Sequence, residues 1–465
     1  MARMPHCLRL ACLLLAGTFL GAAAQGLPPE VDAVLAEGGL PRDAVVVLVA
    51  PAEGGAPRVA HRIDTAVNPA SVAKLATTFA ALDLLGPTYT WTTQVYFDGS
   101  VRGSVLQGNL VIKGQGDPKL VMERLWLLLK RVRALGVHRI TGDIVLDRSA
   151  FTVPARDPAA FDGEPLRPYN AGPDALLVNF KTVAVTFTPE GRQARVRVEP
   201  ALAGVRWPAH VPLAAGECGD WITPLRADFT QPARVRLPGS FPAACGERTW
   251  NIAWPEPDAY AARAIAGMWE EVGGHLGGQV RDGVAPAGAQ PVLELASPPL
   301  AEVVRDVNKF SNNVMAQQLF LTLSLVHRGT GTFEGSREVL AGWWRERLGG
   351  EPPFTENGSG LSRMESITAR QLGQLLQAAW VSPLMPDLAA SLPALGLDGT
   401  LRRQRQNIGL AHLKTGSLNE VAGVAGYVHG PQGRRWVLVA IANHRRASAI
   451  RPAVQALVEW ASRQP

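Results

Sequence analysis

Strand-like patterns occur at both ends of the chain. Continuous or alternating apolar runs rich in Val and Ile are typical of strands, and Gly and Pro clusters bound them. By these criteria we expect strands at residues 44–50, 58–63, 423–429 and 436–443. Strands at both ends with helices between them indicate one domain whose sheet joins the two ends of the chain.

Helical spacing marks several segments between these strands. Leu75, Phe79 and Leu82 recur at helical intervals within residues 71–85, and the following Gly-Pro pair ends that helix. Further helices are expected at residues 300–310, 314–325 and 449–461. Mixed helices and strands of this kind predict an α/β (α+β) fold.

The middle of the chain has a different pattern. Residues 91–113 predict short strands broken by Gly103 and Gly108, followed by a helix near 120–135 and a strand at 142–146. Further on, the chain is β-rich and is then punctuated by Pro and Gly. We interpret this middle part as two inserted, largely β domains, one nested in the other.

The predicted division follows from these changes in pattern. It assigns 1–24 to a signal peptide, 25–88 with 290–465 to the first domain, 89–180 with 250–289 to inserted domain II, and 181–249 to the nested, β-rich domain III.

The N-terminus is typical of a secretory signal peptide. Arg3 and Arg9 give a positive start, residues 10–20 are apolar, and a run of alanines ends at Ala24. The apolar run is shorter than the roughly 18 residues that a spanning helix needs, and no other stretch reaches that length. We therefore expect an exported, periplasmic protein, cleaved after about Ala24, with no transmembrane segment in the mature chain.

Charge and cysteine content narrow the possible functions. The net charge of +6 comes without a basic stripe interleaved with aromatic residues, so nucleic-acid binding is not expected. Cys7 and Cys12 leave with the signal peptide, and an oxidising compartment favours a disulfide between Cys218 and Cys245. Two buried free thiols are the alternative. Neither cysteine has ligands at metal-binding spacing, so no metal site is expected.

A Ser-Val-Ala-Lys sequence at residues 71–74 opens the first predicted helix. Residues three apart share a helix face, so the Lys74 amine should lie beside the Ser71 hydroxyl. A serine hydroxyl is a weak nucleophile until a neighbouring base takes its proton. Lysine can act as that base if burial or a second cation lowers its pKa from about 10.4 toward neutrality.

Two further motifs lie far along the chain. The sequence Ser311-Asn312-Asn313 falls between two predicted helices, where a hydroxyl can relay a proton and a carboxamide can hold a substrate amide. The sequence Lys414-Thr415-Gly416-Ser417 lies on a strand before the last hairpin. There Lys414 supplies positive charge, Thr415 and Ser417 supply hydroxyls for a carboxylate, and Gly416 allows a substrate backbone to approach closely.

Each motif alone is weak, but the three in this order resemble the penicillin-recognising serine enzymes. Other hydrolase signatures are absent from the sequence, and we interpret Gly358-Ser359-Gly360 as a loop rather than a nucleophile turn. Ser71 and Ser311 are 240 residues apart. This spacing makes the chain similar to the DacB-type class C low-molecular-mass penicillin-binding proteins, which are D-alanyl-D-alanine carboxypeptidases and endopeptidases. Four further segments carry this resemblance: 114–118, 168–171, 358–363 and 398–402.

The resemblance implies a penicillin-binding, serine β-lactamase-like transpeptidase domain with two inserted domains. It implies that Ser71 is acylated and Lys74 is the base, that Ser311 and Asn313 line the cleft, and that Lys414, Thr415 and Ser417 bind the carboxylate. It further suggests that Asp147 and Arg363 contact the side chain of the donor stem peptide. A turn or capping role for Asp147 is an equal alternative.

The expected partners are peptidoglycan stem peptides and β-lactams, with no cofactor. Two alternatives from other classes remain. A serine β-lactamase would use the same nucleophile but needs a group that activates the deacylating water. A non-enzymatic wall-binding protein with a relict fold should have decayed motifs, whereas all three are intact here.

Overall fold

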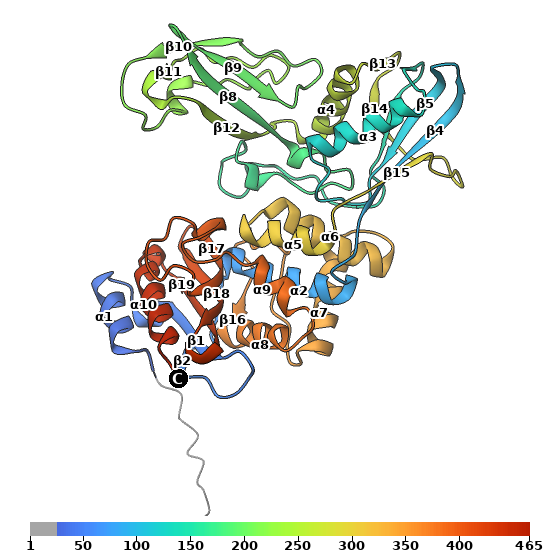
Figure 1. Ribbon diagram of the computed structural model, residues 1–465. Coiled ribbons are helices and arrows are strands. Elements are labelled where there is room, and N and C mark those ends of the chain that lie inside the picture. The colour runs from blue at the N-terminus through green and yellow to red at the C-terminus, as the bar shows by residue number, and fades with distance from the viewer. Residues whose placement is uncertain (1–25) are drawn as a thin grey trace, which may run out of the picture.

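The computed structural model describes residues 26–465 and has two lobes (Figure 1). The terminal lobe (residues 26–91 and 297–465) contains both ends of the described chain, and the middle lobe (92–296) contains the rest. The predicted signal peptide and its two cysteines lie outside the described residues. In the described part of the chain, no helix has both the length and the apolar character needed to cross a membrane.

A five-stranded antiparallel sheet forms the centre of the terminal lobe. Its strand order is β17-β18-β19-β1-β2. The strands are β1 (Val45–Pro51), β2 (Val59–His61), β17 (Ala411–Leu418), β18 (Val421–His429) and β19 (Arg435–Asn443). Because β1 pairs along its whole length with β19, from Val45 opposite Ala442 to Pro51 opposite Trp436, the sheet joins the two ends of the chain as predicted.

Helices cover both faces of this sheet because β1 is apolar at every position. Val45, Val47 and Val49 pack with α1 (Pro29–Glu37) and α10 (Ile450–Ser462). The alternate residues of β1 pack on the opposite face, in the core that contains the remaining helices. Successive strand residues point to opposite faces, so an unbroken apolar run is expected of a strand buried on both sides.

The helical part of the terminal lobe surrounds α2. It contains α2 (Lys74–Leu85), α5 (Leu300–Lys309), α6 (Asn313–Arg328), α7 (Phe333–Arg347), α8 (Ala369–Trp380) and α9 (Met385–Ser391). Every residue of α2 from Lys74 to Leu82 is buried, and the helix contacts α5, α6, α7 and α8. Strand β3 (Ala66–Val67), before the turn that leads to α2, pairs with β16 (Ile367–Thr368), which directly precedes α8. A lysine at the start of so buried a helix must therefore be desolvated.

The first sheet of the middle lobe is built on a long hairpin. Its strands are β4 (Thr92–Arg102), β5 (Val105–Lys113), β6 (Arg139–Ile140), β7 (Ile144–Asp147), β13 (His275–Leu276), β14 (Val280–Gly283) and β15 (Leu293–Ala296). The helices α3 (Met122–Ala134) and α4 (Pro257–Glu271) pack against each other within this part. The prediction that Gly108 breaks a strand is wrong: it lies within β5 opposite Gly99, where a Cβ on either residue would clash with the partner strand. Gly103 does form the turn, with φ +61°.

The second sheet of the middle lobe has the order β11-β10-β9-β8-β12. Its strands are β8 (Thr182–Glu190), β9 (Gln193–Glu199), β10 (His210–Ala214), β11 (Phe241–Pro242) and β12 (Arg248–Ala253). Cys218 and Cys245 form a disulfide beside this sheet, with Cα atoms 4.7 Å apart. Strand β12 belongs to this sheet, which therefore extends a few residues beyond the predicted limit of domain III at 249. Strand β15 belongs to the first sheet, which therefore extends a few residues beyond the predicted limit of domain II at 289.

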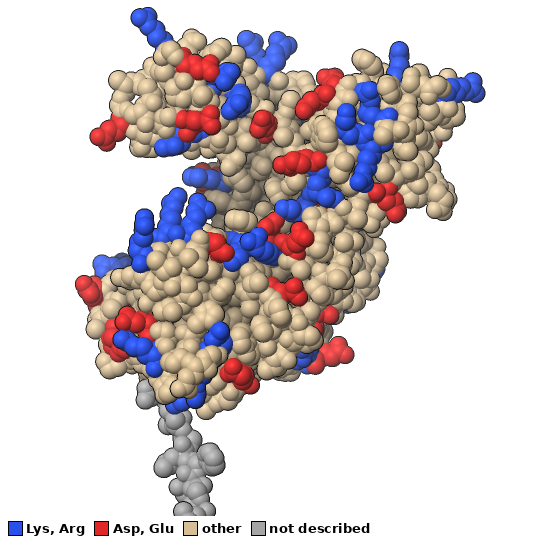
Figure 2. Space-filling view, in the orientation of Figure 1, with Lys and Arg blue, Asp and Glu red and all other residues tan. Residues whose placement is uncertain are grey.

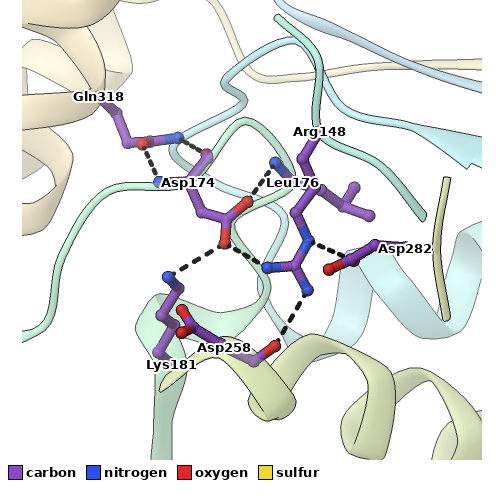
Figure 3. A network of polar contacts seen from close by, with 7 residues as sticks. All are labelled: Arg148, Asp174, Leu176, Lys181, Asp258, Asp282 and Gln318. Carbon is purple, nitrogen blue, oxygen red and sulfur yellow. Dashed lines mark hydrogen bonds and ion pairs between the residues drawn. The ribbon is translucent and has the colours of Figure 1, made fainter. Parts of the chain in front are cut away.

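A buried polar network connects the two lobes around Asp174 (Figure 3). Its carboxylate accepts hydrogen bonds from Arg148 and Lys181, each at 3.0 Å, and its side chain is 6% exposed. The Asp174 backbone exchanges two hydrogen bonds with the Gln318 side chain on α6, at 2.9 and 2.8 Å. Arg148 also pairs with Asp282 at 3.1 Å. The network therefore links a helix of the terminal lobe to several segments of the middle lobe.

Candidate active site

Ser71 lies in a short turn that precedes α2. The turn is a 3-10 helix over Ala70–Ala73, so Ser71 comes just before the α-helix rather than inside its first turn as predicted. Ala70 has φ +47°, a conformation that is costly for a residue other than glycine. Asn68 stabilises this backbone, since its Oδ1 accepts from the Ala70 N–H at 2.9 Å. The structure thus holds the nucleophile in a sharply bent turn.

Lys74 is fully buried and makes three polar contacts. Its Nζ lies 2.9 Å from Ser71 Oγ and 2.7 Å from Asn313 Oδ1, and it also donates to the carbonyl of Ser359. Burial lowers the pKa of Lys74 to about 7, against a smaller opposing effect of the Glu365 charge. A half-neutral amine within hydrogen-bond distance of a serine hydroxyl has both the geometry and the proton affinity of a general base.

The second motif is held at the start of α6. Asn312 caps this helix by accepting from the Met315 N–H at 3.0 Å, and Ser311 adopts φ +56° just before the cap. Asn313 donates from Nδ2 to the Tyr169 carbonyl at 3.2 Å, while its Oδ1 faces Lys74. The middle lobe therefore fixes the orientation of the Asn313 carboxamide.

The third motif lies on β17, next to the second. Lys414 Nζ is 2.9 Å from Ser311 Oγ and 2.7 Å from the Thr415 carbonyl. Lys414 is fully buried, and burial together with the nearby Lys74 charge holds its pKa well below the usual lysine range. A permanent positive charge, as expected from the sequence, is therefore costly at this position until an anion binds beside it.

The remaining residues of this motif differ in their surroundings. Thr415 exchanges a hydrogen bond with the Thr400 hydroxyl at 2.8 Å, and Ser417 is exposed. Gly416 faces the nucleophile turn: a Cβ would lie 2.6 Å from the Pro69 carbonyl. The absence of a side chain is therefore required by packing of β17 on the turn, a reason that differs from the close substrate approach inferred from the sequence.

Arg363 and Asp147 occupy different places. The Arg363 guanidinium stacks on Phe161 at 4.8 Å and donates to the Asn419 carbonyl at 3.3 Å. The Asp147 side chain is fully buried and accepts from the backbone N–H groups of Ser149 and Ala285, both at 2.9 Å. These contacts are those of the capping residue that was the alternative interpretation of Asp147.

A cavity of about 1060 Å³ lies between the lobes, and no residue of the three motifs is among those that line it. Thr415, Gly416 and Ser417 line a smaller pocket of about 290 Å³. Figure 2 shows the hollow between the lobes, with Lys and Arg side chains along the edge of the terminal lobe. Arg363 is among the lining residues and Asp147 is not. The charged residues that line the cavity are Arg148, Arg156, Asp174, Lys181, Asp258, Glu334, Arg337, Glu356 and Arg363.

Several contributors to the site were not predicted. Two are backbone carbonyls, those of Tyr169 and Ser359, and both lie in segments that carried the family resemblance. The Ser359 side chain is buried in its loop and bonded to Asn357 at 2.6 Å, which agrees with its interpretation as a loop residue. A third is Glu365, a buried carboxyl group that no motif indicated.

The geometry agrees with a match to a known family. Residues 27–464 match the D-Ala-D-Ala carboxypeptidase 3 (S13) family. The chain belongs to this family. As a member it is a serine-type D-Ala-D-Ala carboxypeptidase, a hydrolase, as the three motifs predicted. Within residues 26–465, no group of three or more His, Cys, Asp or Glu side chains is placed to hold a metal ion.

Known relatives align with most of this chain. It is 28% identical over 438 residues to a D-alanyl-D-alanine carboxypeptidase of an Actinomadura species, covering 89% of this chain and 80% of the relative. Its fold is similar to that of penicillin binding protein 4 (dacB) from Haemophilus influenzae, with a TM-score of 0.76, 21% identity, and coverage of 93% of this chain and 99% of that one.

A more distant structural neighbour is a predatory endopeptidase from Bdellovibrio bacteriovorus, solved in a form acylated by penicillin G. Its TM-score is 0.51 at 15% identity, with coverage of 90% of this chain and 92% of that one. The Haemophilus influenzae protein has also been solved in complex with a β-lactam. The likeness to these structures confirms a mixed helix and sheet fold with several domains.

Proposed function

We propose that the protein hydrolyses D-Ala-D-Ala stem peptides and D,D-cross-links of peptidoglycan through an acyl-enzyme on Ser71. The observation that carries this proposal is the chain of contacts from Ser71 to Lys74 to Asn313, at 2.9 and 2.7 Å. Lys414 and Ser311, joined at 2.9 Å, complete the site. This arrangement supplies a nucleophile, a base of lowered pKa and a second hydroxyl in one place.

In the acylation step, Ser71 Oγ attacks the carbonyl carbon of the penultimate D-alanine while Lys74 Nζ accepts the hydroxyl proton. The C–N bond to the leaving residue breaks, and the leaving amine takes that proton from Lys74 by way of the Ser311 hydroxyl. Water then attacks the ester: one of its protons returns to Ser71 Oγ, and its hydroxyl group joins the acyl carbon. The shortened peptide leaves as a carboxylic acid, which ionises by giving its proton to the released amine or to solvent. Atoms and protons then balance without a cofactor.

The terminal carboxylate of the substrate would supply the negative charge that favours a protonated Lys414. The terminal carboxylate would bind Lys414, Thr415 and Ser417, and an anion beside Lys414 would raise its lowered pKa and restore its charge. Arg363 lines the cavity and would contact the stem peptide there. Asp147 would act on this contact only through the backbone segments that it caps, because its carboxylate is already occupied.

β-Lactams should acylate the same serine, since relatives have been solved with such inhibitors. The endopeptidase part of the proposal rests on the name of one of these relatives. For the location we propose the periplasm, reached with a signal peptide cleaved after about Ala24. The division into a catalytic domain and two inserted domains is likewise our proposal, with limits moved to include β12 and β15.

Intact-mass measurement after incubation with benzylpenicillin tests the nucleophile. Wild-type protein should gain one penicillin mass, because the lactam C–N bond opens without loss of a group. Ser71→Ala should gain none, and Ser104→Ala, at an exposed position of the middle lobe, should behave as wild type. An adduct that persists in Ser71→Ala would refute the assignment.

Two further assays separate the alternatives. Mass analysis of digested wall fragments should show loss of terminal D-alanine and cleavage of cross-links. Rapid steady-state turnover of a chromogenic cephalosporin would instead indicate a β-lactamase, and intact wall fragments with no penicillin adduct would indicate a non-enzymatic protein.

A further inference from the structure

Glu365 is a buried acidic residue at the base of the loop that contacts Lys74. It is 2% exposed, and its Oε1 accepts from the backbone N–H groups of Glu356 and Asn357 at 3.2 Å each. Its Oε2 is buried and has no hydrogen-bond partner in the described part of the chain. An unpartnered buried carboxylate oxygen is unfavourable for stability and points to another role.

The loop that Glu365 holds runs directly to the catalytic lysine. Two backbone hydrogen bonds between Phe354 and Ser366, at 3.1 Å, close its base. From Asn357, whose side chain bonds the Ser359 N–H at 3.0 Å, the chain leads to the carbonyl that accepts from Lys74. The Gly358 carbonyl accepts from Thr77 on α2 at 2.7 Å. The position of the Ser359 carbonyl therefore depends on the turn that Glu365 caps.

The charges around this pair are few. The positive charge of Lys74 lowers the pKa of Glu365, and the negative charge of Glu356 raises it. Glu365 is in turn the charge that raises the pKa of Lys74. The positive charge of Lys74 helps to lower the pKa of Lys414, and the negative charge of Glu356 opposes the lowering of the Arg156 pKa by burial. Burial raises the pKa of Glu365 to about 7, the value to which burial lowers that of Lys74. The attraction between the two charges raises the pKa of Lys74 and lowers that of Glu365, so it favours the charged form of each.

We infer that Glu365 is a positioning residue for Lys74: it holds the loop that presents the Ser359 carbonyl, and its negative charge stabilises the ammonium that forms when Lys74 takes the serine proton. The inference rests on the proposed function, because it assumes that Lys74 is the base. It predicts two effects of removing the charge, in opposite directions. Lys74 loses its proton more easily, whereas the protonated lysine formed during acylation is less stable.

Acylation by a fluorescent penicillin, measured against pH, tests the inference. Glu365→Gln keeps an oxygen for the two N–H groups and removes the charge. The acid limb of its acylation profile, the pH range over which the rate rises to its plateau, should move about one unit to lower pH. Its plateau rate should fall about tenfold or more. Glu365→Asp, which keeps the charge on a shorter side chain, should keep the wild-type limb. Glu351→Gln, the same charge change at an exposed position nearby, should leave both limb and plateau unchanged.

The outcomes are distinguishable from failure of the proposed function. If wild-type protein is not acylated, the proposed function fails. If wild type is acylated and the limb of Glu365→Gln is unmoved, Glu365 has no electrostatic effect on Lys74 and the inference is overturned, whatever happens to the plateau. Equal shifts in Glu365→Gln and Glu365→Asp would also overturn it, because the cause would then be loop geometry.

A spectroscopic measurement covers the case in which Glu365→Gln does not fold. The infrared stretch of a protonated carboxyl group should disappear with a midpoint that matches the wild-type acylation limb. It is measured in an Asp117→Asn background, since burial also raises the pKa of Asp117 to about 6. A carboxyl group that stays protonated across the whole acylation limb would overturn the inference, because Glu365 would then carry no charge near Lys74.

Discussion

Replacing Lys74 by arginine should remove the base and leave the nucleophile in place. Arginine stays protonated throughout the working pH range, so it cannot accept the Ser71 proton. Lys74→Met, a neutral change of similar length, lacks the base as well and controls for the bulk of the guanidinium in a fully buried site. Both variants should therefore lose acylation for the same chemical reason.

The size of the effect follows from the lowered pKa of Lys74, about 7. At pH 7 about half of the lysine is neutral, whereas an ordinary lysine with a pKa of about 10.4 would be neutral in about one molecule in 2,500. The difference corresponds to about 5 kcal/mol, which burial supplies. Loss of a positioned base lowers rates about 100-fold to 10,000-fold, and we expect a loss within that range.

The assay is the second-order rate of acylation by a fluorescent penicillin from pH 5 to pH 9. The wild-type rate should rise with pH along a limb near 7, and at pH 5 it should be about 100-fold below its plateau. The limb reports the coupled proton of Lys74 and its neighbours rather than one residue alone. Lys130→Arg, the same substitution at an exposed position on α3, should match wild type.

Two results would refute this reasoning. A Lys74→Arg protein that is folded and acylates within tenfold of wild type would show that another group takes the proton. A wild-type limb above pH 9 would show that burial does not lower the pKa of this lysine. Thermal unfolding of each variant establishes that the fold is intact.

Three further predictions concern other parts of the molecule. Asn313→Ala removes a charge-assisted hydrogen bond to the lysine and should slow acylation about 10- to 100-fold in the same assay. Asp174→Asn breaks the buried network and should lower the free energy of unfolding in urea by about 3 kcal/mol. Asp282→Asn, at a side chain that is 69% exposed, should change this free energy by less than about 0.5 kcal/mol. Replacing Cys218 and Cys245 by serine should destabilise the second sheet by about 3.5 kcal/mol in thermal unfolding, with acylation retained; equal losses of both would contradict the separation of this sheet from the site.

The side-chain chemistry of the site was predictable because it is carried by three short motifs. Ser71 with Lys74, and the motifs at 311–313 and 414–417, need only their order and spacing to be found. The structure brings all three motifs together, with Lys414 bonded to Ser311 and Lys74 bonded to Asn313. The terminal sheet was predictable for a similar reason, since its long apolar strands have few other possible environments.

Other features depend on tertiary contacts that no local pattern encodes. The carbonyls of Tyr169 and Ser359 act through the backbone, so residue identity does not reveal them. Gly108 was expected to end a strand because glycine is rare inside strands, but here it is required by close approach of the neighbouring strand. Helix α7 was not expected, and its two internal glycines weaken the helical signal although its tryptophans pack in the core.

The inserted lobe is part of the catalytic architecture because it contacts α6 at two points. At the first residue of this helix, the Tyr169 carbonyl sets the orientation of Asn313 and therefore of its contact with Lys74. Five residues further on, Gln318 is bonded to the backbone of Asp174, whose carboxylate belongs to the buried network between the lobes. Both contacts come from one connection, residues 169–174. A change that loosens this connection should therefore alter the orientation of Asn313 as well as lower stability, although none of the network residues contacts the nucleophile in the structure.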